Sequence, residues 1–402
     1  RLTPGTRLGV QIQPIGEGAP GQEIVLDVVK QPFDVGLAVG MADGVRHELH
    51  PEALPERLHG GGDQRPRPAA GGHQHAGVVD GAALFMNENH AVLENPRVEV
   101  IIDDINNFLR TTSDRYRVIT ADEKTADSFA SNGFSYSVEY YDLLRNHLSP
   151  GGLAAQWVPV TLPTRQYRMI LRTFTRSFPY VQLWYFLPAY KKGPFNSILI
   201  GSNERIELDY KRIQRKLSES PETFSSLVRY GLTSAEAVLP HFVADERVLR
   251  PAVQDALVNS LDHPRYEFFY PWNYSIDRDK QIVANHNFLR TLKQQAQAAF
   301  IADLEISNKD MNRLKQTLAA EDSYLLGFEQ FQTGISLSDQ YRLFDTILAM
   351  APWNDSLRAR IFSQYSHIAS TRGDAAERAR LFKKANRLYE QGTTGRLPPK
   401  VQ

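Results

Sequence analysis

The sequence predicts an α/β protein in which a parallel sheet ends in an antiparallel hairpin and is followed by a mostly helical C-terminal region. Strand-like and helix-like segments alternate three times between residues 97 and 178, the pattern of a doubly wound parallel sheet. Two further strand-like segments have no helix between them, so they should pair antiparallel at one edge. After residue 205, apolar residues recur mainly at helical spacing.

The composition is that of an ordinary soluble globular protein. The 402 residues are 42% hydrophobic and 23% charged, and 46 Lys and Arg balance 46 Asp and Glu. This balance gives no bulk field that would attract nucleic acid or an acidic membrane surface. Cysteine is absent, which excludes disulfides, thiolate nucleophiles and cysteine-based metal sites. The length favours two or three domains.

Residues 1–81 differ from the rest of the chain. They hold more than half of the 26 glycines, whereas no tyrosine or tryptophan occurs before residue 116. The stretch "HGGGDQRPRPAAGGHQH" (59–75) has neither strand nor helix periodicity. We therefore expect a poorly ordered or aberrant N-terminal region, the latter meaning out-of-frame sequence, with one strand-like segment, "EIVLDVV" (23–29). Its histidines match no usual ligand framework, and we expect no metal.

The regular pattern begins at residue 82. "ALFMNENHAVL" (83–93) predicts a helix, "RVEVII" (97–102) a strand and "INNFLRT" (105–111) a short helix. "YRVITA" (116–121) alternates poorly, which favours a strand buried on both faces.

The next helix has a start signal and one apolar face. Ser137 can cap it, and Glu139 lies in its first turn, where the helix dipole favours an anion. Tyr141, Leu144 and Leu148 follow at helical spacing.

The remaining elements complete the predicted sheet. "SPGG" (149–152) should end the helix, and "LAAQWVPV" (153–160) predicts a third strand. Another helix is marked by Tyr167, Ile170, Leu171, Phe174 and Phe178. The hairpin then consists of "YVQLWYF" (180–186) and "NSILIGS" (196–202).

Acidic residues follow two of the predicted parallel strands. Asp103 and Asp104 come after strand 97–102, and Asp122 comes after strand 116–121. Ligands of open α/β sheets bind beyond the carboxyl ends of the strands. A carboxylate there can accept hydrogen bonds from an adenine or ribose, or deprotonate an amine. Asp104 has the alternative role of helix N-cap, and this alternative is weaker for Asp122, which precedes a loop.

A family resemblance covers roughly residues 82–275. The segment from "NENHAVLENPRVEVII" to "AAQWVPV" (87–160) resembles the spermidine synthase-like aminopropyltransferases, particularly the larger bacterial members often fused to a membrane segment. "NSLDHPRYEFFYP" (259–271) resembles an "NTDDRPxxEF" element downstream in the same proteins. The resemblance implies a Rossmann-like, S-adenosylmethionine-dependent methyltransferase sheet. It also implies aminopropyl transfer from decarboxylated S-adenosylmethionine to a small amine.

The resemblance implies roles for the acids at the strand ends. Asp122 matches the general base that accepts the proton of the attacking amine. Asp104, with Asp103 beside it, matches the acid next to the adenine of the co-substrate. The chemistry suits a carboxylate, because an alkylamine is mostly protonated at pH 7 and attacks only when neutral.

The resemblance also implies a substrate-binding set and a loop, 123–135, that closes over the amine. The set consists of Thr125, Asp127, Ser135, Tyr136, Gln156 and Trp157. The family's second loop acid falls at Thr125, so one amine-binding charge is missing, and Asp127 is its nearest substitute.

Three functions stay open because the glycine-rich turn that should hold the co-substrate is not recognisable in residues 1–81. The first is an aminopropyltransferase, the transferase expected if that turn is intact. The second, favoured by Thr125, is an S-adenosylmethionine-dependent methyltransferase of unassigned substrate. The third is a degenerate relative that acts as an interaction module.

The expected organisation follows from these observations. The domains expected are an N-terminal region (1–81), an incomplete Rossmann-like domain (82–205), a helical extension (206–285) and a helical C-terminal region that resembles a tetratricopeptide repeat in part (286–402). We expect a small-amine partner, no nucleic acid and a cytoplasmic location. A homodimer stays open, as does a membrane segment upstream of Arg1, which would make the chain the cytoplasmic part of a membrane-associated protein.

Overall fold

The chain forms two compact units in the computed structural model. Unit 1 comprises Arg1–Lys124 and Asn146–Ala154, and unit 2 comprises Thr125–Arg145 and Ala155–Gln402. The structure describes residues 7–12, 23–28, 81–82, 85–86, 91–94, 98–103, 105–123, 133–187, 195–219, 227, 231–268, 277–371, 376, 379–380 and 383. The domain boundaries expected at residues 81, 205 and 285 stay predictions.

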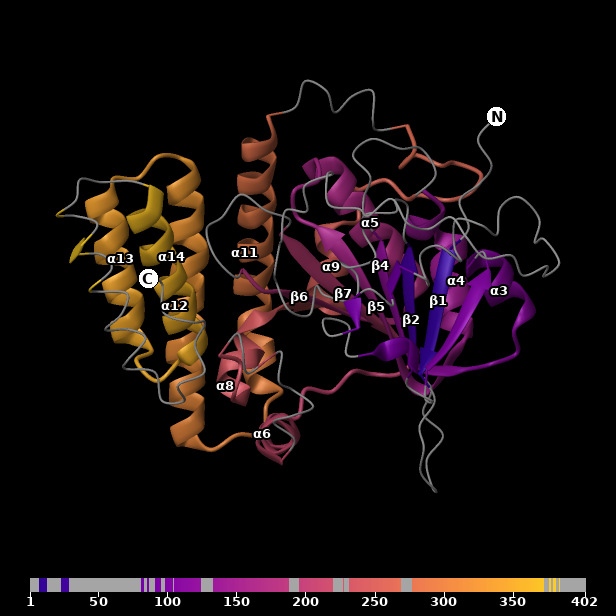
Figure 1. Cartoon of the computed structure of the whole chain (residues 1–402), viewed down its shortest axis with the longest axis horizontal. Helices are drawn as coiled ribbons and strands as arrows, with labels where there is room; N and C mark the ends of the chain where they lie inside the picture. The colour runs from indigo at the N-terminus through magenta and orange to yellow at the C-terminus, as the bar shows by residue number, and fades with distance from the viewer. Residues whose placement is uncertain are drawn as a thin grey trace, which may run out of the picture. The chain divides into compact units, whose positions relative to one another are not determined.

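Unit 1 contains a mixed sheet. Its strand order is β3 (Val98–Asp103), β1 (Arg7–Ile12), β2 (Glu23–Val28) and β4 (Tyr116–Glu123), followed by β5 (Leu148–Pro159), which continues into unit 2. β1 is antiparallel to β3 and β2, and β2 is parallel to β4. β3, β2 and β4 therefore run in one direction and β1 runs against them. The predicted parallel relation of β3 and β4 is confirmed, with β1 and β2 between them (Figure 1).

The side chains of β4 pack less completely than predicted. Tyr116, Ile119 and Ala121 are buried, whereas Val118 and Thr120 are half-buried. The expectation of two fully buried faces therefore holds only in part. The helix α3 (Ile105–Thr111), predicted between β3 and β4, contributes buried Ile105 and Leu109.

Helix α4 (Val138–Asn146) begins as predicted. The Oγ of Ser137 accepts a hydrogen bond from the Tyr140 N–H at 3.2 Å, and Glu139 lies in the first turn. The predicted break at residues 149–152 is wrong, because β5 already begins at Leu148. Gly151 has a φ of 68°, a conformation that glycine adopts without strain.

Unit 2 contains its own group of strands together with the last part of β5. Its strand order is β5, β7 (Asn196–Ser202), β6 (Tyr180–Tyr185) and β8 (Phe242–Asp245). β6 and β7 pair antiparallel, which confirms the predicted hairpin. The hairpin does not form the edge, because β8 pairs antiparallel with β6 on its outer side. β8 is only four residues long, too short for a periodicity signal.

Helix α5 (Thr164–Ser177) carries the predicted apolar face. Tyr167, Ile170, Leu171, Phe174 and the following Phe178 are all buried. The Phe174 and Phe178 rings stack with centroids 4.6 Å apart. This face anchors α5 in the core of unit 2.

The C-terminal half of the chain is mostly helical, as predicted. Its short helices are α6 (Tyr210–Glu219), α8 (Ala235–Val238) and α9 (Glu246–Ala252). The longer ones are α11 (Arg278–Ala302), α12 (Asn308–Gln332), α13 (Leu337–Met350) and α14 (Asp355–Thr371), and consecutive members contact one another (Figure 1). The predicted helical pair 351–391 extends outside the described residues. Within the described ranges, no helix combines the length and apolar character needed to cross a membrane.

A buried arginine links α14 to α12 and to the two residues that follow β6. Arg360 is 4% exposed and lies between the rings of Phe186 and Tyr324, with centroid distances of 5.1 and 4.7 Å. Its guanidinium donates to the carbonyl of Leu187 at 3.1 Å and to the carboxylate of Glu321. The charge of Arg360 is therefore compensated inside the core.

Candidate active site

Three acidic positions lie at nearly the same level of the sheet in unit 1. Asp103, the last residue of β3, pairs with Arg7 of β1. The next residue of β1, Leu8, pairs with Asp27 of β2, which in turn pairs with Asp122 of β4. Because β3, β2 and β4 run in one direction, these backbone positions lie near the carboxyl ends of all three strands.

The strand boundaries differ slightly from the predicted ones. Asp103 belongs to β3 and Asp122 belongs to β4, which continues to Glu123. The sequence places both acids just beyond their strands, because apolar periodicity is lost at a carboxylate even where backbone pairing continues. Sequence reasoning did not single out Asp27, since its strand has no recognisable turn after it.

Several predicted site groups lie outside the described part of the chain. These are the side chains of Asp103 and Asp122 and the residues Asp104, Thr125 and Asp127. Their roles stay predictions. The glycine-rich turn expected within residues 1–81 also falls outside the described ranges.

The segment containing Ser135 and Tyr136 lies in unit 2 and forms a 3₁₀ turn, Phe134–Tyr136. Both residues are fully buried. Tyr136 stacks on Tyr266 with ring centroids 4.8 Å apart. The Oγ of Ser135 has no hydrogen-bond partner among the described residues. A buried hydroxyl without a partner is costly, so this turn carries a local energetic penalty.

The downstream element quoted from the sequence holds this turn in place. Asn259 donates hydrogen bonds from Nδ2 to the carbonyls of Gly133 and Tyr136, at 2.7 and 3.1 Å. Oε1 of Glu267 accepts the Gly133 N–H at 2.8 Å. No role for Asn259 was predicted, although it lies in the element 259–271 that carries part of the family resemblance.

Gln156 and Trp157 lie on β5, within its unit 2 part. Gln156 is fully buried, and its Nε2 donates to the carbonyl of Trp157 at 3.1 Å. Trp157 is half-buried. The structure thus describes four of the six predicted substrate-binding residues. Ser135 and Tyr136 lie in the 3₁₀ turn, and Gln156 and Trp157 lie on β5.

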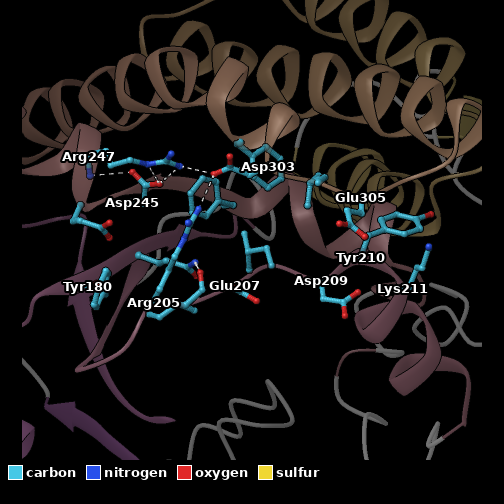
Figure 2. Close-up of a pocket in the computed structure, with 17 residues that line it drawn as sticks. Tyr180, Arg205, Glu207, Asp209, Tyr210, Lys211, Asp245, Arg247, Asp303 and Glu305 are labelled. Atoms are coloured by element: carbon cyan, nitrogen blue, oxygen red, sulfur yellow. Dashed lines mark hydrogen bonds and ion pairs between the residues drawn. The ribbon is translucent and has the colours of Figure 1, made fainter. Parts of the chain in front are cut away.

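A polar cavity of about 690 Å³ lies elsewhere in unit 2 and contains none of the predicted site residues (Figure 2). Arg247 bridges Asp245 at 2.6 Å and Asp303 at 2.8 Å, and Arg205 approaches Asp303 at 3.6 Å. The hydrogen bonds that Arg247 donates to these two carboxylates raise the pKa of Arg247 above its usual value. The charges of Arg247, Asp245 and Asp303 therefore compensate one another. No group of three or more His, Asp or Glu side chains in the described ranges could hold a metal ion.

Part of the chain is similar to known proteins. Residues 76–210 match the family model described as spermine/spermidine synthase domain. A polyamine aminopropyltransferase of Aeropyrum pernix is 30% identical over 108 residues, which cover 26% of this chain and 34% of that protein. The chain therefore aligns with about a third of the length of this relative.

The family match and the fold agree. The matched residues include β3, β4, the Ser135–Tyr136 turn and the β6–β7 hairpin. A mixed α/β sheet followed by a mostly helical region is consistent with the methyltransferase-like fold of these enzymes. Residues 76–210 are thus similar to the spermine/spermidine synthase domain in sequence and consistent with it in fold.

Proposed function

We propose that the protein transfers an aminopropyl group from decarboxylated S-adenosylmethionine to a small amine. The family match over residues 76–210 and the similarity to a polyamine aminopropyltransferase support this proposal. The observation that carries it is the common direction of β3 and β4 within the matched segment, with Asp103 and Asp122 near their carboxyl ends.

The proposed reaction is a nucleophilic substitution at carbon. The amine nitrogen attacks the aminopropyl methylene carbon bonded to the sulfonium, and a C–N bond forms as the C–S bond breaks. The electron pair of the broken bond stays on sulfur, which leaves as the neutral thioether of methylthioadenosine. The carboxylate of Asp122 takes the proton of the amine. Because the sulfonium is a good leaving group, orientation of the two substrates supplies much of the remaining rate enhancement.

A second candidate is a methyltransferase that uses S-adenosylmethionine itself. Thr125 favours it, because this position lacks the second acid that would bind the amine in the resembled family. The two candidates differ in whether the nucleoside retains its methionine carboxylate.

Calorimetric titration distinguishes the candidates. The aminopropyltransferase should bind decarboxylated S-adenosylmethionine and methylthioadenosine at least about tenfold more tightly than S-adenosylmethionine, a difference of about 1.4 kcal/mol. Tighter binding of S-adenosylmethionine would instead favour the methyltransferase. An interaction module should bind none of the three.

The variant Asp122→Asn tests the base. It should lower aminopropyl transfer by about 10²- to 10⁴-fold, the usual contribution of a general base, and leave methylthioadenosine binding within about twofold. Asp114→Asn is the matched control, because Asp114 is exposed and precedes β4. Wild-type rates in Asp122→Asn would remove Asp122 from the mechanism.

A further inference from the structure

Helix α6 has an exposed cationic face. Its apolar residues Tyr210 and Leu217 are buried. The opposite face consists of four exposed cations, Lys211, Arg212, Arg215 and Lys216. These cations lie within an arc of about 140°, because successive residues of an α-helix are about 100° apart. Among the described residues, the face forms one ion pair, between Arg215 and Glu219 at 4.0 Å, and both of these side chains are exposed.

The polar cavity of about 690 Å³ adjoins this helix, since Tyr210 and Lys211 line it (Figure 2). Three exposed acids on its lining form no ion pair with a described residue, and we call them the acidic rim: Glu207, Asp209 and Glu305. The rim therefore keeps its negative charge, whereas the other aspartates of the cavity are paired with Arg247.

The lining of the cavity also has a buried apolar part. The rings of Phe242 and Phe300 are each 5% exposed and stack with centroids 4.9 Å apart. Long cationic side chains cover such surfaces with their methylene groups while their charged ends reach a carboxylate. A guanidinium gains further from contact with aromatic rings. The cavity therefore suits an inserted arginine side chain.

The cationic face and the acidic rim adjoin on one surface, and this surface is complementary to itself. A two-fold axis between them places the cationic face of one copy against the acidic rim of the other, and the same contact then forms twice. In the described part of the chain, neither Arg212 nor Arg215 lines the cavity of its own copy. A second copy can therefore bring guanidinium groups to the rim.

We infer that this surface is a homodimer interface, in which α6 of each copy docks on the acidic rim of the other. Arg212 and Arg215 of one copy contact Glu207 and Glu305 of the second copy. A small cation would neutralise the rim alone, and an anionic partner would neutralise the cationic face alone, whereas a second copy neutralises both. The inference is independent of the proposed aminopropyl transfer.

Sedimentation equilibrium of the full chain at two salt concentrations gives the first test. A dimer should form in about 0.05 M NaCl, and its dissociation constant should rise about tenfold or more in about 0.5 M NaCl, because salt screens contacts between exposed charges. A dimer that does not respond to salt would overturn the inference. A monomer in low salt would also overturn it, and binding of the polycation spermidine to that monomer would assign the cavity to small cations.

Charge reversal gives the second test. Arg212→Glu/Arg215→Glu and Glu207→Lys/Glu305→Lys should each raise the dissociation constant about 100-fold or more, because like charges then face each other. An equimolar mixture of the two variants should form a dimer again, since both contacts of the mixed pair join opposite charges. Folded variants that keep the wild-type dissociation constant, or that do not associate when mixed, would overturn the inference.

Arg165→Glu/Arg176→Glu is the matched control. Both arginines are exposed on α5, and their reversal changes the net charge as much as that of Arg212 and Arg215. The control should keep the dissociation constant within about twofold. Equal weakening in the control would show an effect of net charge and overturn the inference. The salt dependence of the wild-type chain decides the matter even if a reversal variant does not fold.

Discussion

At the scale of single residues, Arg360 shows how the core of unit 2 tolerates a charge. Burial opposes ionisation of Glu321, yet Arg360, His241 and Lys293 hold the pKa of its carboxyl below the usual value. Both partners of the Arg360–Glu321 pair are at most 4% exposed. Removing either member of so deeply buried an ion pair leaves the other charge without its partner and lowers the stability of the fold.

Removing one member of the pair should be costly. We expect Arg360→Met to lower the free energy of unfolding by about 3–5 kcal/mol, because the buried Glu321 carboxylate loses the cation that is hydrogen-bonded to it. The double variant Arg360→Met/Glu321→Leu should recover most of this loss. Urea denaturation measures both, and a double variant no more stable than the single one would contradict the argument.

Residues of the candidate site were predictable to different degrees. Asp103 and Asp122 stand out in the sequence because each interrupts an apolar strand. Asn259 was not predictable, because a side-chain amide that bonds to distant carbonyls leaves no periodic pattern. Its partner Gly133 lies 126 positions away, and only the fold brings them together.

At the scale of elements, α11 fixes the turn that connects β5 to α5. Asn285 donates from Nδ2 to the carbonyls of Val160 and Leu162, both at 2.7 Å. Oε1 of Gln281, one helical turn earlier, accepts the Thr164 N–H at 3.0 Å. α5 has no side-chain cap of its own, so α11 supplies the acceptor.

These contacts predict an order of destabilisation. Asn285→Ala should cost about 2–3 kcal/mol, because two buried carbonyls lose their donor. Gln281→Ala should cost about 1 kcal/mol, the typical value of a helix cap. Chemical denaturation of the two variants gives the comparison, and a larger cost for Gln281→Ala would show that α11 does not hold the turn in this way.

Helix α12 offers a second element-scale prediction. Ser307 caps it by accepting the Asp310 N–H at 3.2 Å. Ser307→Ala should cost about 1 kcal/mol. Ser323→Ala is the control, because Ser323 lies inside the same helix and its hydroxyl only donates back to Ala319; alanine should be neutral or slightly better there. Equal losses in the two variants would exclude a capping role.

The elements themselves show what periodicity can and cannot reveal. Helices such as α5 were predicted because a wide apolar face repeats over several turns. β8 was missed because four residues contain too few apolar repeats to show a period. The start of β5 was missed because its proline and glycines are typical of a turn that ends a helix. The antiparallel direction of β1 could not be predicted, since pairing partners are set by the fold.

At the scale of the whole molecule, buried histidines make stability depend on pH. Burial lowers the pKa of His286 to about 4 and that of His241 to about 3. His286 contacts Tyr185 through Nε2, and His241 lies near Glu321 and Arg360, whose opposite charges act on it in opposite directions. Lys293 also lowers the pKa of His241.

The sign of the pH dependence follows from linkage. Between about pH 6.5 and 4, the unfolded chain binds protons at these histidines and the folded chain does not. The free energy of unfolding should therefore fall as the pH drops through this range, by up to about 1.4 kcal/mol per pH unit for each histidine.

Thermal unfolding at several pH values tests this expectation. His286→Gln should flatten the decline in Tm between about pH 6.5 and 4, whereas His367→Gln, at an exposed position of α14, should leave it unchanged. An unaltered slope in His286→Gln would assign the acid sensitivity to other groups.

Three side chains beyond residue 210 hold backbone groups of earlier parts of unit 2: Asn259, Glu267 and Asn285. The folded unit therefore extends beyond the residues that match the family model. The stretch that matches the family model ends at residue 210, yet its backbone accepts hydrogen bonds from, and donates them to, side chains located 49 or more positions further on. A fragment cut at the limits of that match, residues 76–210, would leave backbone carbonyls and amides without the hydrogen-bond partners that they have in the whole chain. We therefore expect the smallest part of this chain that folds on its own to extend beyond the residues that match the family model.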